Sequence, residues 1–303
     1  MTQGSSGVQR VDLGAESELV DAARALLDRA QDTDGVEAFS EGFEKELGRA
    51  SDHVYWASLI EGTLTSLAAC APDGSAELVV DPDHRRNCHG TALAEAVLEA
   101  RPNAGLWAHG NLPAAQGLAA RLALHPTREL LVMAVDGAAL QRIGGFGATG
   151  DTMPAGFEDL SYSESASRWG REAVEQAWLD VNNDAFSWHP EQGGWDLERL
   201  HRAMEAAWFD PAGVQLLYEG EQLAGFHWTK RHPDGTGEVY VVGLASRHRG
   251  EGMGGPLMQM GLNHLVVEGS PQVILYVEAD NVPAVKRYLQ LGFKVDESHV
   301  VYK

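Results

Sequence analysis

The feature that most constrains the fold is a Gly-rich turn between a strand-like run and a helix-like run. Residues 238–244 are rich in β-branched and aromatic side chains, and Arg247-His-Arg-Gly-Glu-Gly-Met-Gly-Gly-Pro-Leu257 follows them. Backbone N–H groups of such a turn can converge on an anion, because glycines place no Cβ in the way and a helix N-terminus adds partial positive charge. The segment predicts a pyrophosphate site on an α/β unit. It lacks the Gly-Lys-Ser/Thr ending of nucleotide hydrolases and differs from the Rossmann fingerprint.

The next segments carry a family resemblance. A second strand-like run at 273–278 precedes Asn281-Val-Pro-Ala-Val-Lys-Arg-Tyr288 and Leu291-Gly-Phe293. With Arg249-x-x-Gly252-x-Gly254 before them, they resemble the acetyl-CoA-binding half of the GNAT superfamily of N-acetyltransferases. The resemblance implies acetyl-CoA as co-substrate, its pyrophosphate on the loop and its pantetheine arm along a splayed strand. The residues it assigns to CoA are Val242, Gly243, Leu244, Arg249, Gly250, Glu251, Gly252, Met253, Gly254, Gly255, Asn281, Val282, Pro283, Ala284, Val285 and Lys286.

Composition limits the partners. The chain has 303 residues, 44% of them hydrophobic and 8% aromatic, which suits two globular domains. Its 44 acidic and 23 basic residues give a net charge of −21, which repels nucleic acid. The two cysteines, Cys70 and Cys88, form no metal-ligand pattern, so no metal is expected. No apolar run approaches a membrane span and no leader is recognisable, so we expect a cytoplasmic monomer without a membrane partner.

The chain repeats itself. At an offset of about 164 residues, Arg85 aligns with Arg249, Cys88 with Gly252 and Gly90 with Gly254. Further on, Asn111-Leu-Pro-Ala aligns with Asn281-Val-Pro-Ala. Two tandem copies of one unit explain this pattern. We therefore predict an α/β fold (α+β with a mixed sheet) of two tandem GNAT domains: an N-terminal domain at 1–145, a Gly-rich linker at 146–158 and a catalytic C-terminal domain at 159–303.

The first copy lacks a loop glycine and a tyrosine that the second copy has. Cys88 replaces a loop glycine, where a side chain can block phosphate approach, and Leu118 stands where Tyr288 lies in the second copy. We infer that the first copy is not catalytic, and the sequence leaves open whether it binds CoA. If it does, the resemblance assigns that role to Leu78, Val79, Val80, Arg86, Asn87, Cys88, His89, Gly90 and Thr91.

A narrower resemblance covers residues 175–303 most densely. His189-Pro-Glu-Gln-Gly-Gly-Trp195, Gly225-Phe-His-Trp-Thr-Lys230, Gly237-Glu-Val-Tyr-Val-Val-Gly243 and Leu275-Tyr-Val-Glu-Ala-Asp-Asn281 resemble the mycothiol synthase family of tandem GNAT enzymes. The resemblance implies transfer of the acetyl group of acetyl-CoA to the cysteinyl amine of cysteinyl-glucosaminyl-inositol, the last step in making mycothiol.

The reaction defines the groups to look for. An α-amine is largely protonated at neutral pH, so a base must take its proton before nitrogen attacks the thioester, and the departing thiolate benefits from an acid. The resemblance assigns these tasks to Glu238 and Tyr288. It implies an acceptor pocket between the domains, formed by Glu41, Glu191, Lys230, Glu238 and Tyr276. Outside the family pattern, a strand Glu is usually a solvated edge residue and a helix Tyr usually packs in the core.

Two other functions stay open. A tandem acetyltransferase could act on another amine, such as an antibiotic, a polyamine or a peptide N-terminus. The altered first loop also fits a non-catalytic acetyl-CoA sensor, although the intact second loop, Glu238 and Tyr288 argue against that interpretation. The sequence does not give the oligomeric state or the kinetic order.

Overall fold

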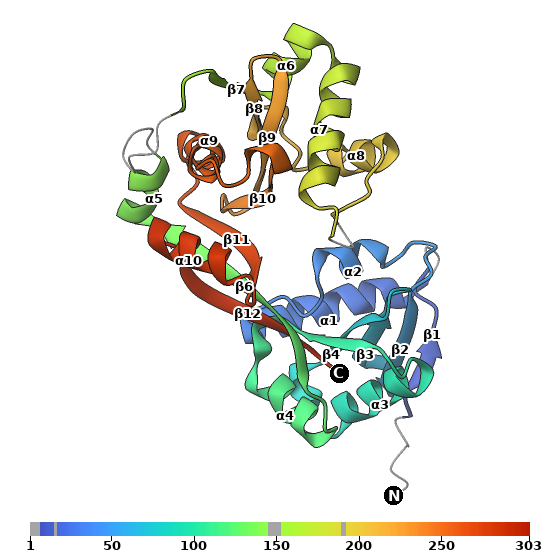
Figure 1. Cartoon of the computed structure of the whole chain (residues 1–303). Helices are drawn as coiled ribbons and strands as arrows, with labels where there is room; N and C mark the ends of the chain where they lie inside the picture. The colour runs from blue at the N-terminus through green and yellow to red at the C-terminus, as the bar shows by residue number, and fades with distance from the viewer. Residues whose placement is uncertain (1–6, 15–16, 145–152, 189–191) are drawn as a thin grey trace, which may run out of the picture. The chain divides into compact units, whose positions relative to one another are not determined.

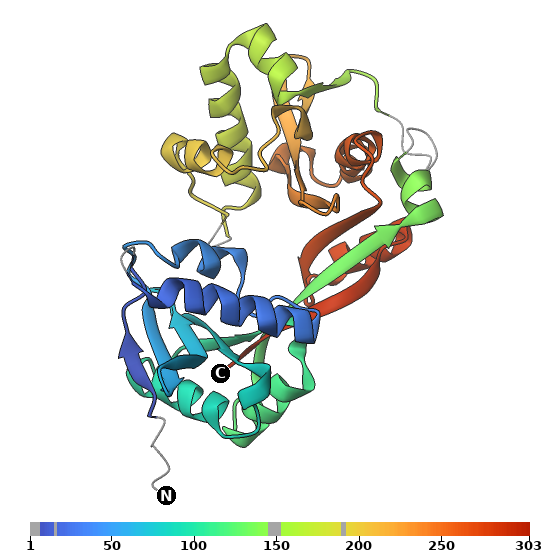
Figure 2. The same cartoon turned by 180° about the vertical axis from the view of Figure 1, so that it is seen from behind.

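The computed structural model describes residues 7–14, 17–144, 153–188 and 192–303. The chain divides into two compact units (Figures 1 and 2). Unit 1 contains Met1–Leu131, Glu278–Asp280 and Glu297–Lys303, and unit 2 contains Val132–Val277 and Asn281–Asp296. The predicted domain boundaries at 1–145 and 159–303 differ from this grouping. Three strands have residues in both units: β6 (Pro126–Asp136), β11 (Gln272–Glu278) and β12 (Lys294–Tyr302). Residues 132–144 belong to unit 2. The predicted linker lies partly outside the described residues.

Unit 1 is built on an antiparallel meander. The elements in chain order are β1 (Gln9–Val11), α1 (Leu19–Asp34), α2 (Glu41–Glu46), β2 (Val54–Ile60), β3 (Thr63–Cys70), β4 (Ser75–Val80), η1 (Pro82–His84), α3 (His89–Ala100), β5 (Gly105–Ala108), η2 (His109–Asn111), α4 (Pro113–Arg121) and β6 (Pro126–Asp136). Strands β1 to β4 pair antiparallel with their neighbours, β4 pairs parallel with β5, and β12 (Lys294–Tyr302) pairs antiparallel with β5.

Alternating side chains of β2 and β3 cover the two faces of the sheet in unit 1. Tyr55 and Leu67 pack in a core with α1, whereas their neighbours Trp56 and Ala68 pack in a second core with α3. This alternation is the period of two that a strand imposes on its side chains. Helices α1 and α3 accordingly lie on opposite sides of the strands (Figures 1 and 2).

Unit 2 repeats the plan. Its elements are α5 (Gly137–Gly144), β7 (Phe157–Ser161), α6 (Tyr162–Trp169), α7 (Arg171–Ala185), α8 (Leu197–Met204), η3 (Pro211–Gly213), β8 (Val214–Glu219), β9 (Gln222–Arg231), β10 (Gly237–Leu244), η4 (Ser246–His248), α9 (Gly254–Val267), β11 (Gln272–Glu278) and α10 (Val282–Leu291). The strand order is β7-β8-β9-β10-β11, antiparallel except for the parallel pair of β10 and β11. The fold is the mixed α/β class that the sequence predicts.

Helices α7 and α9 cover opposite faces of β9 (Figure 1). Trp228 packs edge-on against Trp178 of α7, with ring centroids 5.0 Å apart. The preceding residue, His227, points the other way, and its Nδ1 lies 3.1 Å from the carbonyl oxygen of Leu257 in α9. Asp196 caps α8 by accepting the Arg199 N–H, as its position in the sequence predicts.

Candidate active site

The predicted base, Glu238, lies on β10 opposite Lys230 of β9. Its side chain is buried, with 5% of the residue exposed. The carboxylate oxygen Oε2 lies 2.7 Å from Nε2 of His232 and 3.7 Å from Nζ of Lys230. Because a carboxylate oxygen only accepts, His232 carries a proton on Nε2 in this contact. A buried carboxylate is thus held by one direct donor and one nearby cation.

Aromatic rings lie beside Lys230. The Lys230 ammonium lies 5.3 Å from the ring centroid of Trp208, and the Trp208 ring meets Tyr240 edge-on at 4.7 Å. Tyr240 sits at the register shift of β10, where the strand bulges, and is 36% exposed. Such bulges redirect side chains and often lie next to active sites. Tyr276, 46% exposed, lies two residues after Ile274, the register partner of Glu238. The period of two places Tyr276 on the face of Glu238.

The parallel strands β10 and β11 separate after a short contact. Their register runs only from Gly237 to Val239 on β10, although that strand continues to Leu244. Val242, Gly243 and Leu244, predicted to contact CoA, therefore lie past the point where β11 stops pairing with β10. Their β11-facing backbone groups make no ladder hydrogen bonds to β11. In unit 1, β4 and β5 pair only at Ser75 and Ala76 before β4 continues to Val80.

The Gly-rich loop after β10 adopts the shape that the sequence predicts for an anion site. Gly250 and Gly252 have φ of +82° and +81°, the left-handed region that favours glycine. A Cβ built at Gly250, Gly252 or Gly254 would meet nothing within 4 Å, so space lies open beside all three. Helix α9 begins at Gly254 and directs its first N–H groups toward this loop.

Two contacts brace this loop against the end of α7. Arg249 donates to the carbonyl oxygen of Ala185 at 3.0 Å, and Ser246 donates its N–H to the Asp184 carboxylate at 2.5 Å. The Ser246 N–H lowers the pKa of Asp184, and the charge of Arg249 adds to that effect. Arg249 was predicted to contact CoA, and in this structure its guanidinium holds the loop.

The predicted acid, Tyr288, lies on α10, which begins after Asn281. The Asn281 side chain accepts the Ala284 N–H and caps the helix. Burial raises the pKa of Tyr288, so its phenol stays protonated through neutral pH. The remaining predicted CoA residues of this region, Val282, Pro283, Val285 and Lys286, form the first turns of α10.

The first copy has a cavity of about 540 Å³ at the equivalent place. It is lined by nearly all the residues that the sequence assigns to CoA there: Leu78, Val79, Val80, Arg86, Cys88, His89, Gly90 and Thr91. Arg86 and Cys88 have φ of +65° and +66°, which reproduces the conformation of Gly250 and Gly252 without glycine. The loop shape has thus survived the loss of its glycines, at a cost in backbone strain.

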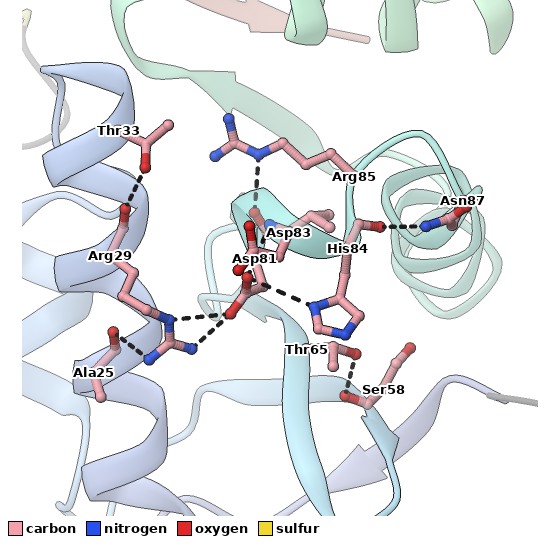
Figure 3. A network of polar contacts seen from close by, with 11 residues as sticks. Ala25, Arg29, Thr33, Ser58, Thr65, Asp81, Asp83, His84, Arg85 and Asn87 are labelled. Atoms are coloured by element: carbon pink, nitrogen blue, oxygen red, sulfur yellow. Dashed lines mark hydrogen bonds and ion pairs between the residues drawn. The ribbon is translucent and has the colours of Figure 1, made fainter.

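A network of ion pairs supports that first loop (Figure 3). Arg85 donates to the Val80 carbonyl oxygen and, through both terminal nitrogens, to Asp34 at 2.7 and 2.8 Å. Arg29 donates to Asp81 at 2.6 Å. Although Asp81 is desolvated, the hydrogen bonds from Arg29 and from the Asp83 N–H lower its pKa. Asn87, also predicted to contact CoA, donates to the His84 carbonyl oxygen.

For two other predicted site residues, Glu41 and Glu191, a place beside Glu238 is not tested. Glu41 belongs to α2 of unit 1, where it pairs with Lys45 at 2.6 Å, and its place in an acceptor pocket stays a prediction. Glu191 lies outside the described residues.

Within the described ranges, no group of three or more His, Cys, Asp or Glu residues is arranged to hold a metal ion. Nor does that part of the chain contain a helix long and apolar enough to cross a membrane.

Three residues around Lys230 and Glu238 are not predicted from the sequence. His232 contacts Glu238, Trp208 lies beside Lys230, and Tyr240 packs against Trp208. The signal for His232 was present, because His232-Pro-Asp-Gly-Thr-Gly237 is a turn sequence between two strand-like runs. A hairpin there brings His232 close to the start of the next strand.

Comparison with known proteins agrees with this geometry. Residues 176–293 match the family model described as acetyltransferase (GNAT) family. A tandem GNAT protein from the clavulanic acid biosynthesis pathway has the same fold, with a TM-score of 0.66 at 18% identity over 97% of each chain. The chain is therefore an acetyltransferase of the GNAT class.

Two curated relatives, both named mycothiol acetyltransferase, share more of its sequence. The relative from Corynebacterium efficiens is 47% identical over 94% of this chain and 93% of its own, and the one from Corynebacterium aurimucosum is 48% identical over 97% and 96%. The chain belongs to the mycothiol acetyltransferase family.

Proposed function

We propose that the chain transfers the acetyl group of acetyl-CoA to the cysteinyl amine of cysteinyl-glucosaminyl-inositol, the last step of mycothiol biosynthesis. The observation that carries this proposal is the buried Glu238 carboxylate, held 2.7 Å from His232 at the start of a strand that splays from its parallel neighbour. The name of the relatives supports the choice of acceptor.

The residues divide the reaction between them. Glu238 removes one proton from the acceptor ammonium, directly or through a water molecule, so that the free amine can attack the thioester carbonyl carbon. Backbone N–H groups of β10 near Val242 to Leu244 stabilise the oxyanion that forms. When the C–S bond breaks, Tyr288 gives its phenolic proton to the CoA thiolate. The second nitrogen proton returns to the Tyr288 phenolate through water, and Glu238 releases the first proton to solvent. The products are the amide and CoA, and no acyl-enzyme is required.

The face around Glu238 suits a polar, sugar-containing acceptor. Lys230 and Tyr276 can hydrogen-bond hydroxyl groups, and a carboxylate attracts the cationic amine. Tyr240 adds an exposed ring beside Trp208, a surface on which the apolar face of a sugar ring can pack. We add Tyr240 to the acceptor residues predicted from the sequence, which also include Glu41 and Glu191.

The loop of unit 2 offers the site for CoA. Its open glycine positions and the N-terminus of α9 fit a pyrophosphate without a lysine. The cavity of unit 1 is a candidate for a second CoA, held by Arg86 and the strained loop that contains Cys88. We further propose that the protein acts as a cytoplasmic monomer.

The function is tested by mass spectrometry of the acceptor after incubation with acetyl-CoA and the purified protein. The Glu238→Gln variant is assayed alongside. We expect acetylation on the cysteinyl nitrogen by the wild type and a loss of at least about 100-fold in kcat for the variant, because general-base catalysis typically contributes that much. Glu198→Gln, which changes a surface carboxylate of α8, is the matched control and should be fully active.

Each alternative function has its own outcome. Acetylation of a different amine with no reaction of cysteinyl-glucosaminyl-inositol would replace the proposed acceptor. Binding of acetyl-CoA with no acetylated product from any amine would favour the non-catalytic sensor. Full activity of Glu238→Gln would remove Glu238 from the role of base.

A further inference from the structure

We infer that His232 is a positioning residue for Glu238: its Nε2–H holds the carboxylate in the orientation needed for proton removal. The inference rests on the proposed role of Glu238 as the base. His232 does not touch the reacting atoms in this scheme, and it acts only through the carboxylate.

The contact geometry supports an orienting role. His232 Nε2 and Lys230 Nζ both approach the same oxygen of Glu238, Oε2, at 2.7 and 3.7 Å. With Oε2 engaged, the other oxygen, Oε1, is the one that would receive the acceptor proton. A donor that fixes one oxygen of a carboxylate also fixes the direction of the other.

The turn that carries His232 is itself well defined. The His232 N–H donates to the Thr236 carbonyl oxygen at 2.8 Å, and the Gly235 N–H donates to the His232 carbonyl oxygen at 2.9 Å. Asp234 accepts both the N–H and the hydroxyl of Thr236, at 2.9 and 3.0 Å. Gly235 takes a φ of +90° that favours glycine, and Pro233 restricts the backbone of His232. The imidazole is thus presented to β10 from a rigid hairpin.

The charges around the imidazole favour this contact in either protonation state. The Glu238 carboxylate approaches the imidazole from β10, and the Asp234 carboxylate belongs to the same turn as His232. The Lys230 ammonium, on β9, also lies near Glu238. The Thr236 N–H lowers the pKa of Asp234, and the charge of His232 contributes to a smaller extent. A neutral imidazole donates to Glu238 through Nε2–H, and an imidazolium donates through the same atom with added positive charge.

Three substitutions separate this role from simple packing. Gln places an N–H donor at the distance of Nε2 from the backbone, Asn places it one bond shorter, and Phe keeps the ring shape without a donor. We expect His232→Phe and His232→Asn to lower kcat about 10- to 100-fold with little change in the acceptor KM. His232→Gln, which restores the donor, should stay within about 5-fold of the wild type. Acetyl-CoA affinity should be unchanged in all three.

The pairing with Glu238 is tested by a double-mutant cycle. If His232 acts through the carboxylate, His232→Phe should have no further effect on kcat in a Glu238→Gln background. Equal losses in both backgrounds, or equal activity of the Gln and Phe variants, would overturn the inference. If Glu238→Gln is itself fully active, the base assignment fails. If Glu238→Gln is inactive but His232→Phe is unaffected, only the role of His232 fails.

Discussion

At the scale of single residues, the site separates two ionisable groups by their surroundings. The Glu238 carboxylate has a hydrogen-bond donor and a cation beside it, whereas burial raises the pKa of Tyr288 and so favours its neutral phenol. A base must be ionised and an acid must be protonated before the reaction begins. The two environments therefore suit the two roles that the resemblance assigns.

Tyr288→Phe tests the acid. Because burial raises the pKa of Tyr288 and so preserves the protonated form, the wild type should keep its acid well into the alkaline range. The variant should lose about 10- to 100-fold in kcat, because the thiolate leaves without a proton donor. Stopped-flow or thiol-release assays measure the rate, and isothermal titration should find the acetyl-CoA affinity unchanged. An unaltered kcat with a weaker affinity would instead make Tyr288 a binding residue.

Some residues around Glu238 could be predicted from the sequence and others could not. Glu238 and Lys230 could be predicted from the family pattern, and their spacing fits a hairpin. His232 could not be assigned a partner, because its contact depends on the register in which β9 and β10 pair. The left-handed backbone conformation of Arg86 and Cys88 could not be predicted from the sequence either, because these residue types seldom adopt it.

At the scale of elements, the strands were the most predictable part. The runs predicted at 238–244 and 273–278 lie in strands β10 and β11, because β-branched and aromatic residues favour a strand. Helix α6 and strand β12 were not predicted. The capping box of Ser161 and Glu164 marks the start of α6 in the sequence, but β12 carries polar residues at Asp296, Glu297 and Ser298 that obscure its pattern.

The close packing of α9 on β9 predicts that an alanine at Gly261 destabilises the protein, and Gly117 serves as the control position. A Cβ at Gly261 of α9 would collide with the ring of buried His227, so Gly261→Ala should destabilise the protein by about 2 kcal/mol or more despite the better helix propensity of Ala. Gly117 of α4 is also helical, but a Cβ there would meet nothing within 4 Å. Gly117→Ala should therefore stabilise by about 0.5–1 kcal/mol.

Urea unfolding measures both variants. The same chemical change is expected to have opposite signs at the two sites, which excludes a general effect of replacing glycine. A stable Gly261→Ala variant would mean that His227 can leave its position at little cost.

At the scale of the whole molecule, each unit buries a histidine that resists protonation. Burial lowers the pKa of His227 in unit 2 to about 4. Burial, with a smaller contribution from His109, lowers the pKa of His299 in unit 1 to about 4. Neither residue belongs to the proposed catalytic groups. Their consequence is for stability, because a histidine that stays neutral when folded but titrates normally when unfolded links folding to pH.

The sign of that linkage follows from the two states. Above pH 6.5 both the folded and the unfolded histidine are neutral, so neither group costs any stability. As pH falls from 6.5 toward 4, these histidines bind protons in the unfolded chain but stay neutral in the folded chain. The free energy of unfolding therefore decreases. With a folded pKa of about 4, each histidine should cost about 2 kcal/mol at pH 5. Urea unfolding at pH 7.5 and pH 5.0 should show this loss, and His227→Phe should lose less than the wild type over the same interval, whatever its stability at pH 7.5. An equal loss in both proteins would mean that acid acts on unit 2 through its carboxylates and not through His227.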